Sequence, residues 1–136
     1  YGHYIKGYKK LRFEEKIIKK RMWAFIIFFE EIPIGYIQYY NGHDFPREQG
    51  DDISELPISC AGLDCYIGEV EFTGKGIGTK ALSDFLHQYV FPSFKNVFVD
   101  PDTANVGAIR VYAKTGFAVV KKVNHGKITW MLCERD

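Results

Sequence analysis

The sequence has no long apolar run and almost no net charge, and each shortage argues against a class of protein. Its longest purely apolar run, Met22 to Phe29, has eight residues, whereas a membrane-spanning helix needs about 20. The run therefore predicts a buried strand, and we expect no membrane partner. A net charge of +1 argues against non-specific binding to nucleic acid. No charged-then-apolar leader opens the chain, so nothing indicates secretion.

Cysteine is also scarce. The three cysteines, Cys60, Cys65 and Cys133, are odd in number and have no CxxC spacing, so they fit neither a zinc site nor a disulfide framework. We expect reduced thiols, a cytoplasmic protein and no bound metal.

Charge is distributed unevenly along the chain. Residues 44–71 hold eight acidic side chains against the single base Arg47, which leaves 17 bases and 9 acids elsewhere. Such a division predicts one surface that attracts cations and another that tolerates anions. We expect Asp51, Asp52 and Glu69 to steer a polycation toward the protein. A merely solvated acidic loop is the alternative.

The first half of the chain has apolar patterns of two kinds. Residues 11–21 place apolar side chains at spacings that predict an amphipathic helix with charges on its other face. Residues 22–29 predict a strand that is apolar on both faces, and residues 34–40 alternate, so the two should form an antiparallel hairpin. Residues 41–59 hold prolines, glycines and acids, which predicts a long loop.

The second half alternates strands and helices. The predicted elements are a strand at 60–68, a glycine-rich loop at 73–78, a helix at 79–90, a strand at 96–99, a helix at 106–115, and strands at 117–123 and 128–133 joined by a turn. This order predicts one α/β domain over residues 1–136, with a mixed, mostly antiparallel sheet, one parallel βαβ crossover and flanking helices.

The glycine-rich loop, TGKGIG at 73–78, precedes a predicted helix. Glycines let a backbone approach a ligand closely, and a helix start carries about half a positive charge, so phosphate is the expected occupant. A P-loop is excluded because Gly76 follows Lys75 where a hydroxyl should stand. A tight turn without a ligand is one alternative. A dinucleotide fingerprint is another, but that fold needs repeated βαβ units.

A second motif, NVGAIRVYAKTGF, follows at 105–117. Asn105 is a good helix N-cap, and Tyr112 lies two helical turns further on, on the same face. Ala108 stands between them, and its small side chain leaves room for a ligand along that face.

The two motifs together resemble the GNAT acetyltransferases, whose pyrophosphate loop is (Q/R)xxGx(G/A) and whose second helix looks like NxxAxxxYxxxGF. The resemblance is closest to the aminoglycoside 6′-N-acetyltransferases, over roughly residues 60–134. It is carried by GLDCYIGE (62–69), GKGIGT (74–79), VDPDTAN (99–105) and AIRVYAKTGF (108–117), and PIGYIQ (33–38) adds weaker support. Siderophore-type lysine acyltransferases share parts of this pattern.

The chain departs from the family in three places. Thr73 stands at the first loop position, and Gly107 stands where an arginine is frequent. Nothing before residue 11 resembles the family's first strand, so we expect an N-terminally incomplete domain whose first strand, and part of whose acceptor site, lie outside this chain.

The resemblance implies a GNAT-like fold that binds acetyl-CoA. The residues expected to contact it are Tyr66, Ile67, Thr73, Gly74, Lys75, Gly76, Ile77, Gly78, Thr79, Asn105, Ala108 and Tyr112. Asn105 would hold the pantetheine arm, and Tyr112 would stand near the sulfur as general acid. Asp64 would be the catalytic acid beside the acceptor amine, and Asp100 would contact the acceptor, with Asp51 and Asp52 as further contacts.

These roles predict acetyl transfer to a primary amine of a small polycation, by a monomer or homodimer. A backbone amide near Tyr66 or Ile67 would polarise the thioester, and Asp64 would accept the amine proton. The mechanism requires Asp64 and Tyr112 to reach one ligand, so placement on opposite sides of the sheet would contradict it. The alternatives are an acetyl-CoA-binding module without catalysis, or an acyltransferase for siderophore lysines or peptide amines.

Overall fold

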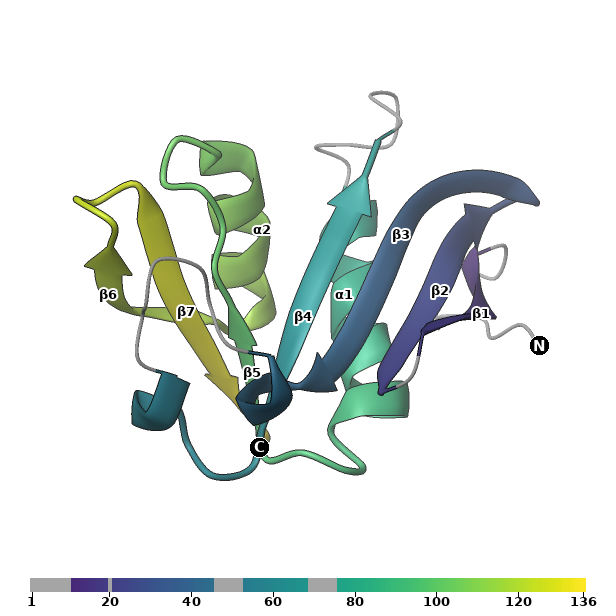
Figure 1. Cartoon of the computed structure of the whole chain (residues 1–136). Helices are drawn as coiled ribbons and strands as arrows, with labels where there is room; N and C mark the ends of the chain where they lie inside the picture. Colours follow the sequence, from purple (N-terminus) through teal and green to yellow (C-terminus); the bar gives the residue numbers. More distant parts are fainter. Residues whose placement is uncertain (1–10, 20, 46–52, 69–75) are drawn as a thin grey trace.

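Seven strands form one sheet in the order β1-β2-β3-β4-β5-β7-β6, with two α-helices packed on one face (Figure 1). The computed structural model describes residues 11–19, 21–45, 53–68 and 76–136. The strands are β1 (Leu11–Lys19), β2 (Met22–Phe29), β3 (Ile32–Asn41), β4 (Cys60–Ile67), β5 (Asn96–Val99), β6 (Ala118–Val123) and β7 (Ile128–Glu134). The helices are α1 (Ile77–Phe85), which continues into the π-helical turn η5 (Leu86–Val90), and α2 (Val106–Thr115), with short 3₁₀ turns η1 (Gly42–Asp44) and η3 (Ile53–Glu55).

Strand pairing in the described sheet is antiparallel except between β4 and β5. Helix α1 and the turn η5 connect this parallel pair, so β4, α1 and β5 form the predicted βαβ crossover. The expectation of a mixed, mostly antiparallel sheet with one crossover is confirmed.

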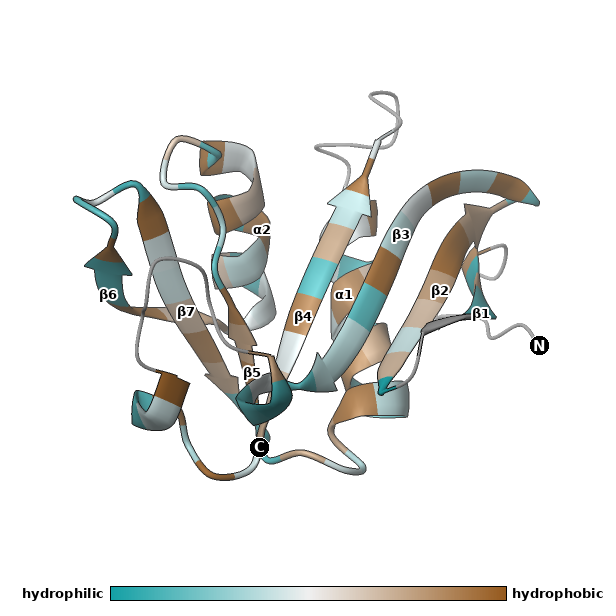
Figure 2. Ribbon diagram, in the orientation of Figure 1, coloured by the Kyte–Doolittle hydropathy of each residue, from teal (hydrophilic) through white to brown (hydrophobic). Residues whose placement is uncertain are grey.

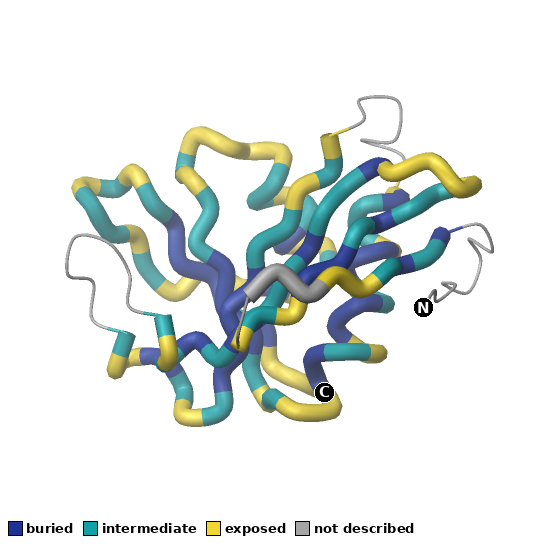
Figure 3. The backbone as a smooth tube through the Cα atoms, turned by 45° about the vertical axis from the view of Figure 1, so that its right-hand side comes forward, coloured by how far each residue is buried: buried dark blue, intermediate teal, exposed yellow. Residues whose placement is uncertain are grey.

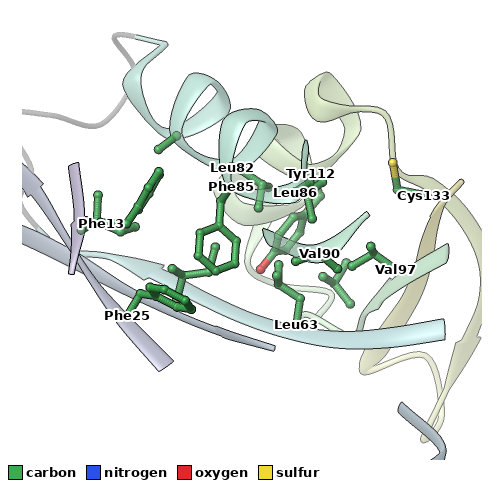
Figure 4. Close-up of a cluster of buried hydrophobic side chains, with 14 of the residues drawn as sticks. Phe13, Phe25, Leu63, Leu82, Phe85, Leu86, Val90, Val97, Tyr112 and Cys133 are labelled. Carbon is green, nitrogen blue, oxygen red and sulfur yellow. The ribbon is translucent and has the colours of Figure 1, made fainter. Parts of the chain in front are cut away.

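The main core lies between the sheet and the two helices (Figures 3 and 4). Phe85 of α1 is at its centre, with ring centroids 5.3 Å from Phe13, 4.9 Å from Phe25 and 5.9 Å from Tyr39. Each ring meets its neighbour near edge-to-face, a favourable aromatic geometry. These contacts join β1, β2 and β3 to the first helix. A smaller cluster on the opposite face packs Leu56 against Cys60, Phe98 and Trp130.

The helix predicted for residues 11–21 is wrong, because these residues form the edge strand β1. Its register sets Leu11 opposite Phe29 and Phe13 opposite Ile27 of β2. Leu11 and Phe13 are both 0% exposed, whereas Arg12 points outward and pairs with Glu31 at 2.7 Å. The apolar spacing at the start of the segment suits either structure, and pairing with the hydrophobic strand β2 (Figure 2) decides between them.

The other predicted strands and helices agree with the structure to within about two residues at their ends, and the predicted loops at 41–59 and 73–78 lie partly outside the described residues. The β2–β3 hairpin turns through Glu30 and Glu31, whose φ values of 51° and 66° are those of a two-residue turn that matches the twist of the strands. The alternation over residues 34–40 predicts one face for Ile34 and Tyr36, but Ile34 lies at a register irregularity and packs in the helix-side core. Residues 1–10 lie outside the described residues, so the expectation of a missing first strand stays a prediction.

Phe13→Ala tests the placement of β1. Phe13 is fully buried against Phe85 and Tyr89, so we expect the free energy of unfolding to fall by about 3–5 kcal/mol in chemical denaturation. Glu15→Ala, two residues further along the same face but exposed, is the control and should change it by no more than about 0.5 kcal/mol. Similar losses for both variants would contradict the strand.

Candidate active site

The sheet opens between its two parallel strands. Strands β4 and β5 pair from Cys60 opposite Asn96 to Gly62 opposite Phe98. Strand β5 ends at Val99, while β4 continues to Ile67 beside β3 alone among the described strands. The two strands diverge in Figure 1, with α2 behind the opening. The far half of β4 therefore has one edge without a strand partner in the described sheet.

Backbone amides on that edge are available to a ligand. The N–H of Gly68 donates to the carbonyl of Ile34 at 2.9 Å, which places the hydrogen bonds to β3 on the even-numbered residues of β4. Amides of an antiparallel strand alternate in direction, so those of Cys65 and Ile67 point toward the opening. The sequence indicated Tyr66 or Ile67, and the alternation favours Ile67.

A cleft of about 740 Å³ lies over the end of β4, the start of α1 and one face of α2. We call it the main cleft, and its volume is typical of a small-molecule site. It is lined by Cys65, Tyr66, Ile67, Gly76, Gly78, Thr79, Lys80, Leu82, Asn105, Gly107, Ala108, Arg110, Val111, Tyr112 and Lys114.

Most residues expected to contact acetyl-CoA line this cleft. Ile77 is an exception, because its side chain is 5% exposed and packs in the main core. Thr73, Gly74 and Lys75 lie outside the described residues, as do Asp51 and Asp52. Their expected roles stay predictions.

The start of α1 suits an anion. Gly76 is the N-cap with φ 80°, and because glycine has no side chain it makes no capping hydrogen bond to the first amides of α1. A built Cβ on Gly78 would lie 3.4 Å from Ile67 and 3.9 Å from Val111, which shows how closely α1 approaches β4 and α2. The glycines thus bring the backbone of the helix start to the wall of the cleft.

Three cationic side chains line the main cleft that were not among the residues expected to contact acetyl-CoA: Lys80, Arg110 and Lys114. Lys80 lies in the first turn of α1, where the helix dipole disfavours a cation unless an anion binds nearby. Arg110 and Lys114 are four residues apart and share a face of α2. Arg110 and Lys114 are three and seven residues after Gly107, so all three lie on one face of α2. This spacing is the sequence signal from which the two cations could have been predicted.

A second hollow of about 190 Å³, here called the side pocket, adjoins the main cleft. It is lined by Leu63, Asp64, Cys65, Asp100, Pro101, Asn105, Ala108 and Tyr112. Four of these residues, Cys65, Asn105, Ala108 and Tyr112, also line the main cleft. The two spaces therefore meet at these four side chains, which we call the seam.

Helix α2 supplies three residues of the seam as the sequence predicted. Oδ1 of Asn105 accepts from the N–H of Ala108 at 3.2 Å, which confirms the N-cap. Gly116 ends the helix with φ 121°. Tyr112 lies between these ends, and its ring centroid is 5.4 Å from that of Phe117.

Tyr112 is 7% exposed, and its hydroxyl lies beside Leu63 of β4 (Figure 4). Burial raises its pKa well above the ordinary tyrosine value, and the nearby Cys65, Asp64 and Asp100 raise it further. The phenol therefore stays protonated at neutral pH and can donate a proton. Burial likewise raises the pKa of the Cys65 thiol, to about 12.

Asp64 and Tyr112 approach the side pocket from different faces of the sheet. Asp64 shares the face of Gln38, whose Nε2 donates to its Oδ2 at 2.8 Å, while Tyr112 packs in the core on the helix side. Opposite faces are the arrangement that was expected to contradict the mechanism, but Asp64 and Tyr112 nevertheless both line the side pocket. The opening beside β5 lets side chains from the two faces meet.

The Tyr40 side chain explains why a glycine stands at position 62. A Cβ built on Gly62 would lie 2.3–2.9 Å from three atoms of the Tyr40 ring, so the ring lies directly over this glycine. Gly107 differs, because the nearest atom to a built Cβ, Oδ1 of Asn105, is 3.9 Å away. Nothing in the described structure requires a glycine there.

No group of three or more His, Cys, Asp or Glu side chains within the described ranges could hold a metal ion. Cys60, Cys65 and Cys133 are all described, and each is a free thiol. The described helices include none that is long and apolar enough to cross a membrane.

Comparison with known proteins gives the chain's relationships. The model of the acetyltransferase (GNAT) domain matches residues 7–125. The aminoglycoside N(6′)-acetyltransferase type 1 of Klebsiella pneumoniae is 34% identical over an alignment of 91 residues, and the alignment covers 62% of this chain and 42% of that protein. The protein from Serratia marcescens with the same name gives the same values. The match thus spans less than half the length of these relatives.

Solved structures share the fold. AAC(6′)-Ib in complex with acetyl-CoA superimposes with a TM-score of 0.69 at 28% identity, over 88% of this chain and 68% of that chain. The same enzyme with coenzyme A and kanamycin gives a TM-score of 0.69 at 28% identity, over 88% and 70%.

Gly62→Ala tests the packing beside Asp64. The added methyl would displace the Tyr40 ring, so we expect the free energy of unfolding to fall by about 1–3 kcal/mol. Gly107→Ala is the matched control, because its methyl meets open space in a helix and should raise stability by up to about 1 kcal/mol. Urea denaturation of both variants measures the difference, and equal effects would exclude the close contact at Gly62.

Proposed function

Because the chain belongs to the GNAT acetyltransferase domain family, we propose that it transfers an acetyl group from acetyl-CoA to a primary amine of a small, aminoglycoside-like polycation. The observation that carries this proposal is the meeting of the main cleft and the side pocket at the seam. A donor and an acceptor held in these two spaces would have their reacting ends at Tyr112 and Asp64. Such alignment by itself can contribute several kcal/mol to a transfer reaction.

The main cleft fits acetyl-CoA in chemistry as well as in volume. The glycines at the start of α1 bring backbone amides and the positive end of a helix dipole to its wall, where a diphosphate would bind. Lys80, Arg110 and Lys114 line the same cleft and supply positive charge for phosphate groups. When bound, acetyl-CoA supplies the activated acyl group as a thioester.

The residues around the seam have complementary roles. The amide of Ile67, on the open edge of β4, donates to the thioester carbonyl oxygen and polarises it. Asp64 accepts a proton from the acceptor amine, directly or through a water, so that the nitrogen is neutral when it forms the amide bond. As the carbon–sulfur bond breaks, Tyr112 donates its proton to the sulfur. Its raised pKa means that the phenol carries this proton at neutral pH.

An acceptor that carries several positive charges fits the side pocket. Asp64 and Asp100 both line it, and carboxylates favour ammonium groups over neutral amines outside the reacting position. AAC(6′)-Ib, which shares the fold, has been solved with kanamycin. Aminoglycoside-like acceptors therefore rank ahead of siderophore lysines and peptide amines.

The setting of the protein is part of the proposal. We infer one acetyltransferase domain over residues 1–136 that acts in the cytoplasm, because the three free thiols suit a reducing compartment.

Thiol release from acetyl-CoA over a panel of aminoglycosides, polyamines and peptide amines tests the function. We expect turnover with aminoglycosides and less with the other two groups. Isothermal titration with acetyl-CoA accompanies the assay. Binding without turnover on any amine would favour a binding module without catalysis, and neither binding nor turnover would reject the proposal.

Gly76→Val tests the phosphate seat. A branched side chain at the N-cap of α1 would stand where the diphosphate is expected, so we expect calorimetry to detect no acetyl-CoA binding. Gly126→Val is the control, because Gly126 has the same φ of 80° and no atom within 4 Å of a built Cβ. Both variants strain the backbone, but Gly126→Val should bind normally. Retained binding in Gly76→Val would move the cofactor site elsewhere.

Tyr112→Phe tests the general acid. The change removes only the hydroxyl, so the ring keeps its contact with Phe117 and the fold should persist. We expect kcat to fall by about a hundredfold or more, with the acetyl-CoA dissociation constant nearly unchanged. Tyr39→Phe, a hydroxyl deletion in the core of β3, should leave kcat unaltered. Full activity in Tyr112→Phe would remove this residue from the mechanism.

A further inference from the structure

The Asp64 carboxylate is held from the neighbouring strand. Gln38 of β3 lies directly opposite Asp64 in the register, and its Nε2 donates to Oδ2 at 2.8 Å. The hydroxyl of Tyr36, two residues earlier on the same face, donates to Oε1 of Gln38. Three side chains on one face of two strands therefore form a chain of hydrogen bonds that ends at Asp64.

The direction of these hydrogen bonds is fixed by which groups can donate and which can only accept. A carboxylate only accepts, so the amide nitrogen of Gln38 must face Asp64. The amide oxygen then faces Tyr36, whose hydroxyl must donate. Burial and the nearby Asp64 raise the pKa of Tyr36, which keeps the hydroxyl protonated. A flipped amide would set its oxygen against the Asp64 carboxylate, so Asp64 selects the orientation of Gln38, and the hydrogen bond from Tyr36 to the amide oxygen holds the side chain in it.

Gln38 itself lines neither the main cleft nor the side pocket. Its contact with the site is through Asp64, whose hydrogen bond to Gln38 uses Oδ2. The other oxygen, Oδ1, is left for a group in the side pocket. Holding one oxygen restricts rotation of the carboxylate and so fixes the direction of the second.

We propose that Gln38, held by the hydrogen bond from Tyr36, is a positioning residue that fixes the Asp64 carboxylate so that Oδ1 meets the acceptor amine. The inference rests on the proposed function, because it assigns the amine to Asp64. It adds two residues of β3 to the acceptor side of the site, neither of which touches the acetyl donor.

A double-mutant cycle between positions 38 and 64 tests the inference. Gln38→Met keeps the length of the side chain and removes its amide, and we expect kcat/KM for the acceptor to fall about tenfold, the scale of a hydrogen bond to a charged group. The acetyl-CoA dissociation constant should not change. Asp64→Asn should have a larger effect, and adding Gln38→Met to it should lower kcat/KM no further, because Gln38 acts through Asp64.

Tyr36→Phe extends the cycle. We expect a smaller fall than for Gln38→Met, and no additional fall when the two are combined. Tyr39→Phe, one strand position from Gln38 but on the opposite face, is the control and should match the wild type. Thermal unfolding of each variant confirms that the fold is retained. Effects at 38 and 64 that multiply as independent changes would overturn the proposal.

A measurement without turnover separates this inference from the proposed function. In ¹⁵N-labelled protein, one side-chain amide proton of Gln38 should resonate downfield and exchange slowly, and Asp64→Ala should abolish both properties. An ordinary, fast-exchanging amide would overturn the inference whether or not the protein is active. If the wild type acetylates no amine while this signal is present, the proposed function fails and the hydrogen-bonded chain stands.

Discussion

The site depends on a pairing of strands that stops early. Strands β4 and β5 stay together for three residue pairs, and from there every second backbone amide of β4 faces an opening instead of a neighbouring strand. A buried amide without a partner is unfavourable, so an edge of this kind inside a sheet is stable when water or a ligand completes its hydrogen bonds. The opening also lets α2 place Tyr112 within reach of a carboxylate from the other face.

Gly62 shows how packing supports this geometry. It is the last residue of β4 paired with β5, and it lies beneath the Tyr40 ring, two positions before Asp64. The strand pairing and the Tyr40 packing both act on the segment that leads into the opening. The spacing Gly-x-Asp places Gly62 and Asp64 on the same face of β4. The carboxylate therefore lies next to a position where the Tyr40 ring leaves no room for a side chain.

The parts that sequence could predict are those with local signals. Asn105 and Gly116 mark the ends of α2 within a dozen residues, and the structure has both as caps. The prediction of a helix at residues 11–21 failed because the few apolar side chains there suit a helix or a strand. Pairing with β2, which the local sequence does not show, makes this segment a strand. The bond from Gln38 to Asp64 joins residues 26 positions apart, so no short pattern reveals it. Lys80 and Arg110 likewise share a cleft only after α1 and α2 pack.

Cys65 lies at the seam, where a thioester carbon and an acceptor nitrogen would meet. A thiolate there could take the acyl group itself and make the reaction proceed through an acyl-enzyme. With its pKa raised to about 12 by burial, this sulfur stays a thiol and is a poor nucleophile at neutral pH. The protonated cysteine thus favours direct passage of the acetyl group within a ternary complex, so the steady-state kinetics should be sequential and not ping-pong.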